Sequence, residues 1–196
     1  EVRAVLFECS DEQKERYLYP VIRGEKTACF AQTEPDAGGD PAGMKTRAVL
    51  DGDHWVINGT KRFITGAGYS DFAQVMAVTD PEKRARGGIT CFLVDMDTPG
   101  VTIERRWPTM MGDAPFQILF ENACVPVGNV VGEVGQGFGL AQSWLQEGRI
   151  KGHGARCIGI AERALDMMMD YSQIRTTFGQ PLSERQAVQF MISDSV

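Results

Sequence analysis

The sequence predicts an α+β protein, with an antiparallel β-barrel or sandwich over residues 26–131 between helical segments at 1–25 and 132–196. Three observations predict this class. Short β-prone runs recur between turn signals in the middle region. A helix start signal precedes that region, and apolar residues recur at helical spacing after it. The 196 residues suffice for one large domain or two modest ones.

The first segment contains a helix that begins at Ser10. Ser10 is a capping residue, and Asp11 and Glu12 place negative charge at the positive end of the helix dipole. Gln13 completes a capping box. Pro20 and Gly24 limit the helix. Residues 2–7 form an apolar run without a start signal, so we expect the sequence to begin inside a larger protein.

The middle segment carries about eight short strands, which is typical of a barrel or sandwich. The predicted strands are 27–33, 46–50, 55–57, 63–65, 72–78, 89–94, 101–103 and 117–120. Asn58-Gly59 is the clearest turn signal, because Asn-Gly is favoured in two-residue hairpin turns. The charged run at 80–86 predicts a solvated hairpin tip.

The last segment is helical after Gly132. Apolar residues recur from Leu140 to Met168, and several glycines within this stretch indicate close packing against another body. Gly179-Gln180-Pro181 is expected to end the helix. A cap at 183–186 predicts a second helix, which continues to Val196.

Composition excludes several classes of protein. A net charge of −6 and a pI near 5.0 argue against nucleic acid as the partner. The five cysteines are scattered without metal-ligand spacing, so neither a metal site nor a disulfide framework is expected. No apolar run reaches the roughly 18 residues of a membrane span, and the first residues lack the charged-then-apolar order of a signal peptide. The P-loop, GxGxxG and GxSxG motifs are absent. We therefore expect an intracellular protein without a membrane span.

Two strand ends form the candidate site. The run 27–33 breaks at Glu34-Pro35 into a loop with Gly38 and Gly39, which permit close backbone approach to a ligand. The second strand carries Phe63 and Thr65 on one face and also ends in glycines. Together these groups suit a flat heterocycle that needs both stacking and hydrogen bonds at its edge.

Four blocks, FAQTEPDAGGD, WVINGTKRFITGAG, ILFENACVP and RTTFGQPLSERQ, resemble the acyl-CoA dehydrogenase family in order and spacing. The resemblance implies that residues 1–25 are the tail of an N-terminal helical domain. It likewise implies that 26–131 are the middle β-domain and 132–196 the first helices of a C-terminal domain. The implied cofactor is FAD, and the implied reaction removes an α-proton from an acyl-CoA and passes a β-hydride to flavin N5.

The resemblance also implies residue roles. Phe30, Gln32, Thr33 and Gly38 would lie along the flavin, with the Thr33 hydroxyl and nearby amides at its pyrimidine edge. Phe63 would lie beside the isoalloxazine. The Thr65 hydroxyl would approach N5, where a donor stabilises charge that builds on reduction. Either threonine taken alone would be an ordinary strand residue.

A second group of residues matches the block that reaches the FAD of a neighbouring subunit, which implies a homo-oligomer, either a dimer or a tetramer. This group comprises Arg175, Thr177, Phe178 and Gln186. A guanidinium suits a pyrophosphate and an aromatic ring suits adenine. Without that resemblance, Arg175 would be a solvated charge at a helix end.

Two departures concern the acyl substrate. Gly39 occupies a position where many members carry a serine that contacts the thioester ligand, and Gln32 replaces a residue that is often apolar. The base that takes the α-proton is expected beyond Val196. Glu147 is a weaker candidate because it lies one residue, about 100° of helix, from a position that some members use. Arg149 would line the acyl pocket.

Three functions remain open. The first is an acyl-CoA dehydrogenase that passes electrons to an electron-transfer flavoprotein. The second is an acyl-CoA oxidase or flavin monooxygenase on the same scaffold. The third is a non-enzymatic binding module. The expected location is the cytoplasm, or the mitochondrial matrix if the source is a eukaryote.

Overall fold

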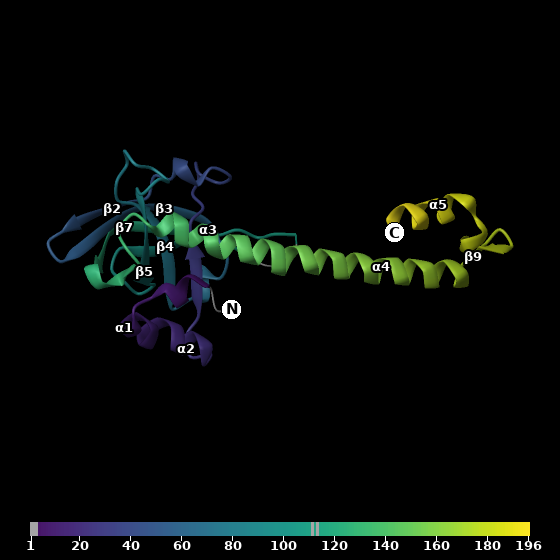
Figure 1. The fold of residues 1–196 in the computed structure, drawn as a ribbon, viewed down its shortest axis with the longest axis horizontal. Helices are drawn as coiled ribbons and strands as arrows, with labels where there is room; N and C mark the ends of the chain where they lie inside the picture. The colour runs from purple at the N-terminus through teal and green to yellow at the C-terminus, as the bar shows by residue number, and fades with distance from the viewer. Residues whose placement is uncertain (1–3, 111, 113) are drawn as a thin grey trace. The chain divides into compact units, whose positions relative to one another are not determined.

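The computed structural model describes residues 4–110, 112 and 114–196. The chain divides into two compact units, Glu1–Trp144 and Leu145–Val196, which are described one at a time (Figure 1). None of the described helices is both long and apolar enough to cross a membrane.

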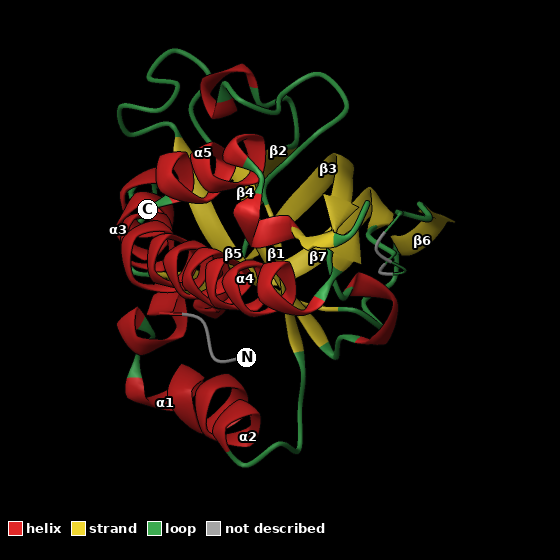
Figure 2. Ribbon diagram, turned by 90° about the vertical axis from the view of Figure 1, so that its right-hand side faces the viewer, coloured by secondary structure: helices red, strands yellow, loops and turns green. Residues whose placement is uncertain are grey.

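The first unit is built on an eight-stranded sheet (Figure 2). Seven strands follow the order β6-β7-β3-β2-β4-β5-β8, and β1 pairs with β4. The strands are β1 (Ala28–Ala31), β2 (Arg47–Asp51), β3 (His54–Ile64), β4 (Phe72–Val78), β5 (Ile89–Asp95), β6 (Val101–Arg106), β7 (Phe116–Pro126) and β8 (Val130–Val131). Most pairs are antiparallel, but β1 and the start of β2 pair with β4 in parallel.

The predicted α+β class is confirmed, whereas a closed barrel is wrong. Among the described strands, no ladder joins β6 to β8. Strand β6 pairs with β7 and β8 pairs with β5, at the two ends of the strand order, so each leaves one backbone edge without a strand partner among the described residues. The sheet is therefore open and mixed.

Apolar side chains cover both faces of the sheet, so all seven residues of β4 are buried. The cluster on one face includes Ile57, Val75 and Phe120. The cluster on the other face includes Phe72 and Met76, and the N-terminal helical segment packs onto it.

The N-terminal helical segment begins where the sequence predicts. Ser10 and Gln13 form the expected capping box, with bonds of 3.0 and 3.2 Å. The segment comprises a 3₁₀ turn at Ala4–Glu8, then α1 (Asp11–Gln13), a π-helical stretch at Lys14–Leu18 and α2 (Tyr19–Ile22). The Gln13 amide also donates to the carbonyls of Gly128 and Val130 at 2.7 Å, which ties this segment to the sheet.

The hairpin predicted at Asn58-Gly59 is wrong. Strand β3 continues through this dipeptide without a turn. The two-residue turn that joins β2 to β3 lies at Gly52-Asp53. Asn58 and Gly59 instead form a bulge, where the register against β7 shifts. The Asn58 side-chain oxygen accepts from the Asn122 N–H at 2.8 Å, and this long-range bond fixes the bulge. The predicted strands 55–57 and 63–65 are thus parts of one strand.

The charged run 80–86 is an exposed turn between β4 and β5, as predicted. Short 3₁₀ turns lie at Pro41–Gly43, Ala67–Tyr69 and Val127–Asn129. After β8 the chain enters α3 (Gly137–Glu147).

The second unit is helical, with one small hairpin. A π-helical stretch at Gly148–Gly154 leads into α4 (Ala155–Ile174), followed by β9 (Thr176–Thr177), β10 (Gln180–Pro181), a 3₁₀ turn at Leu182–Glu184 and α5 (Gln186–Ser195). The long helix ends at Ile174 rather than at Gly179, because the hairpin already begins at Thr176. The predicted side-chain cap is also wrong, since α5 follows Arg185 without a capping hydrogen bond.

Candidate functional site

The ends of β1 and β3 lie together, as the sequence predicts. The Arg62 N–H donates to the carbonyl of Thr33 at 2.8 Å. The neighbouring Lys61 ammonium donates to the carbonyl of Gln32 at 3.1 Å. Two consecutive peptides after β1 are therefore held by two consecutive residues of β3. This junction brings Thr33 beside the strand that carries Phe63 and leads into Thr65.

A buried ion pair lies under this junction. The Lys61 ammonium is 2.9 Å from Glu34 Oε1, and the two side chains are 0 % and 3 % exposed. Burial lowers the pKa of Lys61 to about 8, although Glu34 opposes that shift. Burial raises the pKa of Glu34, but the nearby ammonium and hydrogen bonds outweigh it and hold this pKa below its usual value. Near pH 7 both groups are charged and compensate each other.

Glu34 also organises the loop that follows β1. Its carboxylate accepts from the N–H groups of Lys45 at 2.6 Å and Thr46 at 2.9 Å. The loop therefore folds back over Glu34 before β2 begins. Gly38 and Gly39 lie exposed on it, and a Cβ added to either would meet no atom within 4 Å. The predicted glycine loop thus leaves open space where a ligand can approach its backbone.

An aromatic surface lies at the end of β3. Phe63 is 52 % exposed and has a φ of 59°, a backbone conformation that is unusual for a bulky residue. Its ring meets the edge of Trp107 at 5.5 Å. The guanidinium of Arg105 stacks 3.8 Å from the Trp107 ring, and that of Arg62 lies 5.3 Å from it. Strained residues of this kind are found preferentially at functional sites. Thr65, the next candidate, is exposed.

Three buried polar atoms near the junction lack a hydrogen-bond partner among the described residues. They are Gln32 Oε1, Thr46 Oγ1 and Trp107 Nε1. An unsatisfied buried group costs about 1–3 kcal/mol, so each is suited to a partner that is not part of this chain. A flat heterocycle such as isoalloxazine fits this surface. The surface offers the exposed ring of Phe63, the hydroxyls of Thr33 and Thr65 and the unsatisfied polar atoms. The residues present therefore fit FAD.

The second unit presents the other predicted cofactor residues on its hairpin. Phe178 and Gly179 have φ values of 51° and 80°, as a tight primed turn requires, and the Phe178 side chain is 99 % exposed. Arg185 donates to the carbonyl and hydroxyl of Thr177, and its guanidinium lies 5.5 Å from the Phe178 ring. Arg175 caps the end of α4 and is exposed. Gln186 is exposed at the start of α5.

The remaining candidates lie near the start of the second unit. Arg149 is exposed in the π-helical stretch. Glu147 is the last residue of α3, and its side chain lies outside the described part of the structure. In the part of the chain that is described, no three His, Cys, Asp or Glu residues could hold a metal ion.

Sequence reasoning missed three residues of the site: Lys61, Trp107 and Arg185. Lys61 had a detectable signal, because it occupies an inward position in a strand whose neighbours Ile57 and Ile64 are buried. A lysine at such a position needs a buried acceptor. Nothing in the local pattern placed Trp107 against Phe63, since 44 residues separate them in the sequence.

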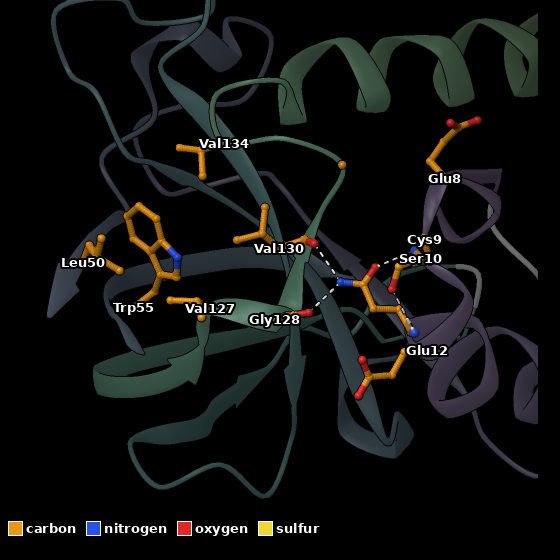
Figure 3. A pocket seen from close by; sticks show the side chains of 12 residues that line it. Glu8, Cys9, Ser10, Glu12, Leu50, Trp55, Val127, Gly128, Val130 and Val134 are labelled. Atoms are coloured by element: carbon orange, nitrogen blue, oxygen red, sulfur yellow. Dashed lines mark hydrogen bonds between the residues drawn. The ribbon is translucent and has the colours of Figure 1, made fainter. Parts of the chain in front are cut away.

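A large open groove lies elsewhere in the first unit. It has a volume of about 750 Å³ and runs between residues 8–13 and the segment 127–134 (Figure 3). Leu50 and Trp55 form its other wall. The Gln13 amide also lines the groove and donates to the carbonyls of Gly128 and Val130. None of the predicted flavin residues lines this groove, so the candidate site is the β1–β3 junction.

Two family profiles match this chain. The acyl-CoA dehydrogenase middle domain matches residues 29–122, and the acyl-CoA dehydrogenase C-terminal domain matches residues 135–196. Isobutyryl-CoA dehydrogenase, mitochondrial, from Dictyostelium discoideum is 40% identical over 190 residues, which cover 94% of this chain and 44% of that protein.

Solved structures give the same result. Butyryl-CoA dehydrogenase from Megasphaera elsdenii has a TM-score of 0.88 and 36% identity, and the match covers 99% of this chain and 52% of that one. A glutaryl-CoA dehydrogenase from Mycobacterium smegmatis, in complex with FADH2, has a TM-score of 0.83 and 34% identity over 96% and 48% of the two chains. The chain therefore spans about half the length of the relatives that it matches.

Proposed function

Because this chain belongs to the acyl-CoA dehydrogenase family, we propose that it forms the central part of an FAD-dependent acyl-CoA dehydrogenase. The proposed reaction removes a proton from the α-carbon of an acyl-CoA thioester and a hydride from its β-carbon. The observation that carries the proposal is the junction of β1 and β3, where Arg62 binds the Thr33 carbonyl at 2.8 Å. This junction gathers the candidate flavin residues of two separate blocks.

Bound FAD would supply the acceptor for the hydride. Thr33 would bind the pyrimidine edge through its hydroxyl and N–H, in a row with Phe30, Gln32 and Gly38. Phe63 would contact the ring through its exposed face. The Thr65 hydroxyl would donate at N5, because a fixed donor there stabilises negative charge without reorganisation.

The acyl-CoA is proposed to approach the exposed Gly38-Gly39 backbone, where the open space beside both glycines supports this role. Arg149 would line the acyl pocket. We place the carboxylate base outside these 196 residues and keep Glu147 as the weaker alternative. That carboxylate must lie on the face of the substrate opposite the flavin.

The exposed hairpin of the second unit supports a homo-oligomer, either a dimer or a tetramer. Arg175 and Gln186 would bind the pyrophosphate region of the FAD in a neighbouring subunit, and Phe178 would stack on its adenine. Thr177 would hold this hairpin through its bonds to Arg185. We propose an electron-transfer flavoprotein as the electron acceptor. The proposed location is the cytoplasm or the mitochondrial matrix.

The test is an anaerobic titration of the full-length protein that contains these residues, purified and loaded with FAD, with butyryl-CoA and isobutyryl-CoA. Loss of the flavin absorbance near 450 nm is expected with at least one substrate, as is slow reaction with air afterwards. Rapid release of peroxide on admission of air would instead indicate an oxidase. Failure to bind FAD at all would contradict the flavoenzyme proposal.

A further inference from the structure

The stability of the fold does not by itself explain why Lys61 and Glu34 form a buried ion pair. Two apolar residues of similar volume are often as stable as a buried ion pair, or more so. Side-chain exposures of 0 % and 3 % place this pair among the most deeply desolvated groups in the described part of the chain. Its contacts are directed at one short stretch of backbone, the segment immediately after β1.

Lys61 determines the orientation of the peptide between Gln32 and Thr33. Its ammonium donates to the Gln32 carbonyl at 3.1 Å. In a planar trans peptide the N–H points opposite to the carbonyl, so the Thr33 N–H must point away from Lys61. The next carbonyl, that of Thr33, is held by the Arg62 N–H at 2.8 Å. The carbonyls of Gln32 and of Thr33 itself, on either side of the Thr33 Cα, are therefore both hydrogen-bonded to β3.

Glu34 fixes the ammonium that makes this contact. The Thr46 N–H donates to the same oxygen as Lys61, Oε1, and the Lys45 N–H donates to Oε2, so the carboxylate cannot follow a movement of Lys61 without losing those bonds. Rotation of the Gln32–Thr33 peptide would leave a buried ammonium short of an acceptor. Such a loss is costly in a desolvated site. The pair is thus a rigid link between β3 and the segment that carries Thr33.

We propose that Lys61 and Glu34 are positioning residues of the flavin site, which orient the Thr33 N–H and hydroxyl toward the pyrimidine edge of FAD. The proposal rests on the proposed function, because it needs the flavin to bind at the β1–β3 junction. Neither side chain touches the flavin in this proposal. Both act through the backbone of Gln32 and Thr33.

The test compares FAD affinity with folding stability in a double variant, Lys61→Met with Glu34→Gln, which removes both charges together and keeps an oxygen acceptor for the N–H groups of Lys45 and Thr46. FAD affinity is measured by quenching of flavin fluorescence and stability by urea unfolding without FAD. The matched control is Lys45→Met with Asp36→Asn. That ion pair lies in the same loop at 2.7 Å but is 71 % and 63 % exposed.

We expect the buried double variant to keep its unfolding midpoint but to bind FAD about tenfold more weakly or worse, as loss of a charged hydrogen bond predicts. The control variant should keep the unfolding midpoint and the FAD affinity of the unmodified protein. The single variant Lys61→Met should lose both stability and FAD affinity, because it leaves the Glu34 carboxylate buried and unpaired. Weaker FAD binding at an unchanged unfolding midpoint in the double variant is the result that a purely structural role would not produce.

FAD affinity equal to that of the unmodified protein in the buried double variant overturns the positioning role. If that variant does not fold, the single variant Glu34→Gln replaces it, since the amide keeps an oxygen toward Lys45 and Thr46. Unchanged FAD affinity in Glu34→Gln would equally overturn the role. Failure of the unmodified protein to bind FAD is a different result, because it removes the proposed flavin function itself.

Discussion

Replacing Gly59 by alanine should strongly destabilise the protein. Gly59 lies in the β3 bulge with a φ of +147°, a region that residues with a Cβ rarely adopt. The new Cβ would lie 2.5 Å from Thr46 Oγ1 and 2.6 Å from Thr46 Cα. The second of these atoms is backbone, so a side-chain rotation cannot relieve the clash. Thr46 is also fixed by its bond to the buried carboxylate of Glu34.

Two costs add in this variant. Backbone strain at such a φ contributes about 1–3 kcal/mol. Overpacking contributes a further 1–3 kcal/mol, roughly, in a site that cannot expand. We therefore expect Gly59→Ala to lower the free energy of unfolding by about 2–6 kcal/mol. This is a large fraction of the stability of an ordinary domain, which is about 5–15 kcal/mol.

Urea unfolding followed by circular dichroism measures this loss as a shift of the midpoint at unchanged slope. The control is the same substitution at Gly39→Ala, where the new Cβ meets nothing within 4 Å. It should change stability by less than about 0.5 kcal/mol. Equal effects of the two substitutions would refute the explanation of the bulge by close packing against Thr46.

Three further predictions follow from the site. The pKa of Glu34 lies below its ordinary value of 4.5, so its charge stabilises the fold above that pH and the stabilisation is lost as the pH falls. Acid unfolding curves should therefore be steeper for the unmodified protein than for Glu34→Gln, and parallel curves would disprove this. Gly39→Ser should lower KM for acyl-CoA at unchanged FAD affinity, measured by steady-state kinetics and flavin fluorescence, because the hydroxyl enters open space; an unchanged KM would contradict a thioester contact there. Arg185→Ala frees the Thr177 and Phe178 hairpin from its anchor and should weaken FAD binding several-fold, as measured by flavin fluorescence; full affinity would exclude this hairpin from the cofactor site.

Local patterns predicted most elements of this chain correctly. The capping box at Ser10, the strand at Phe72–Val78 and the exposed turn at 80–86 all depend on neighbouring residues, which sequence reasoning sees directly. The proximity of the two strand ends at the site was predicted because both end in glycines beside hydroxyls or aromatics, and the Arg62–Thr33 bond confirms it. The hairpin at Asn58-Gly59 was mistaken because a distant partner, Asn122, converts the turn signal into a bulge.

The sequence alone determined the α+β class, the order of helices and strands and the residues that resemble a flavin site, because each depends on spacing along the chain. Only the tertiary structure showed that the sheet is open, that Lys61 is buried against Glu34 and that Trp107 packs on Phe63. The last two of these features join residues 27 and 44 positions apart in the sequence. They are decided by desolvation and packing between strands, and a local pattern does not identify the distant partner.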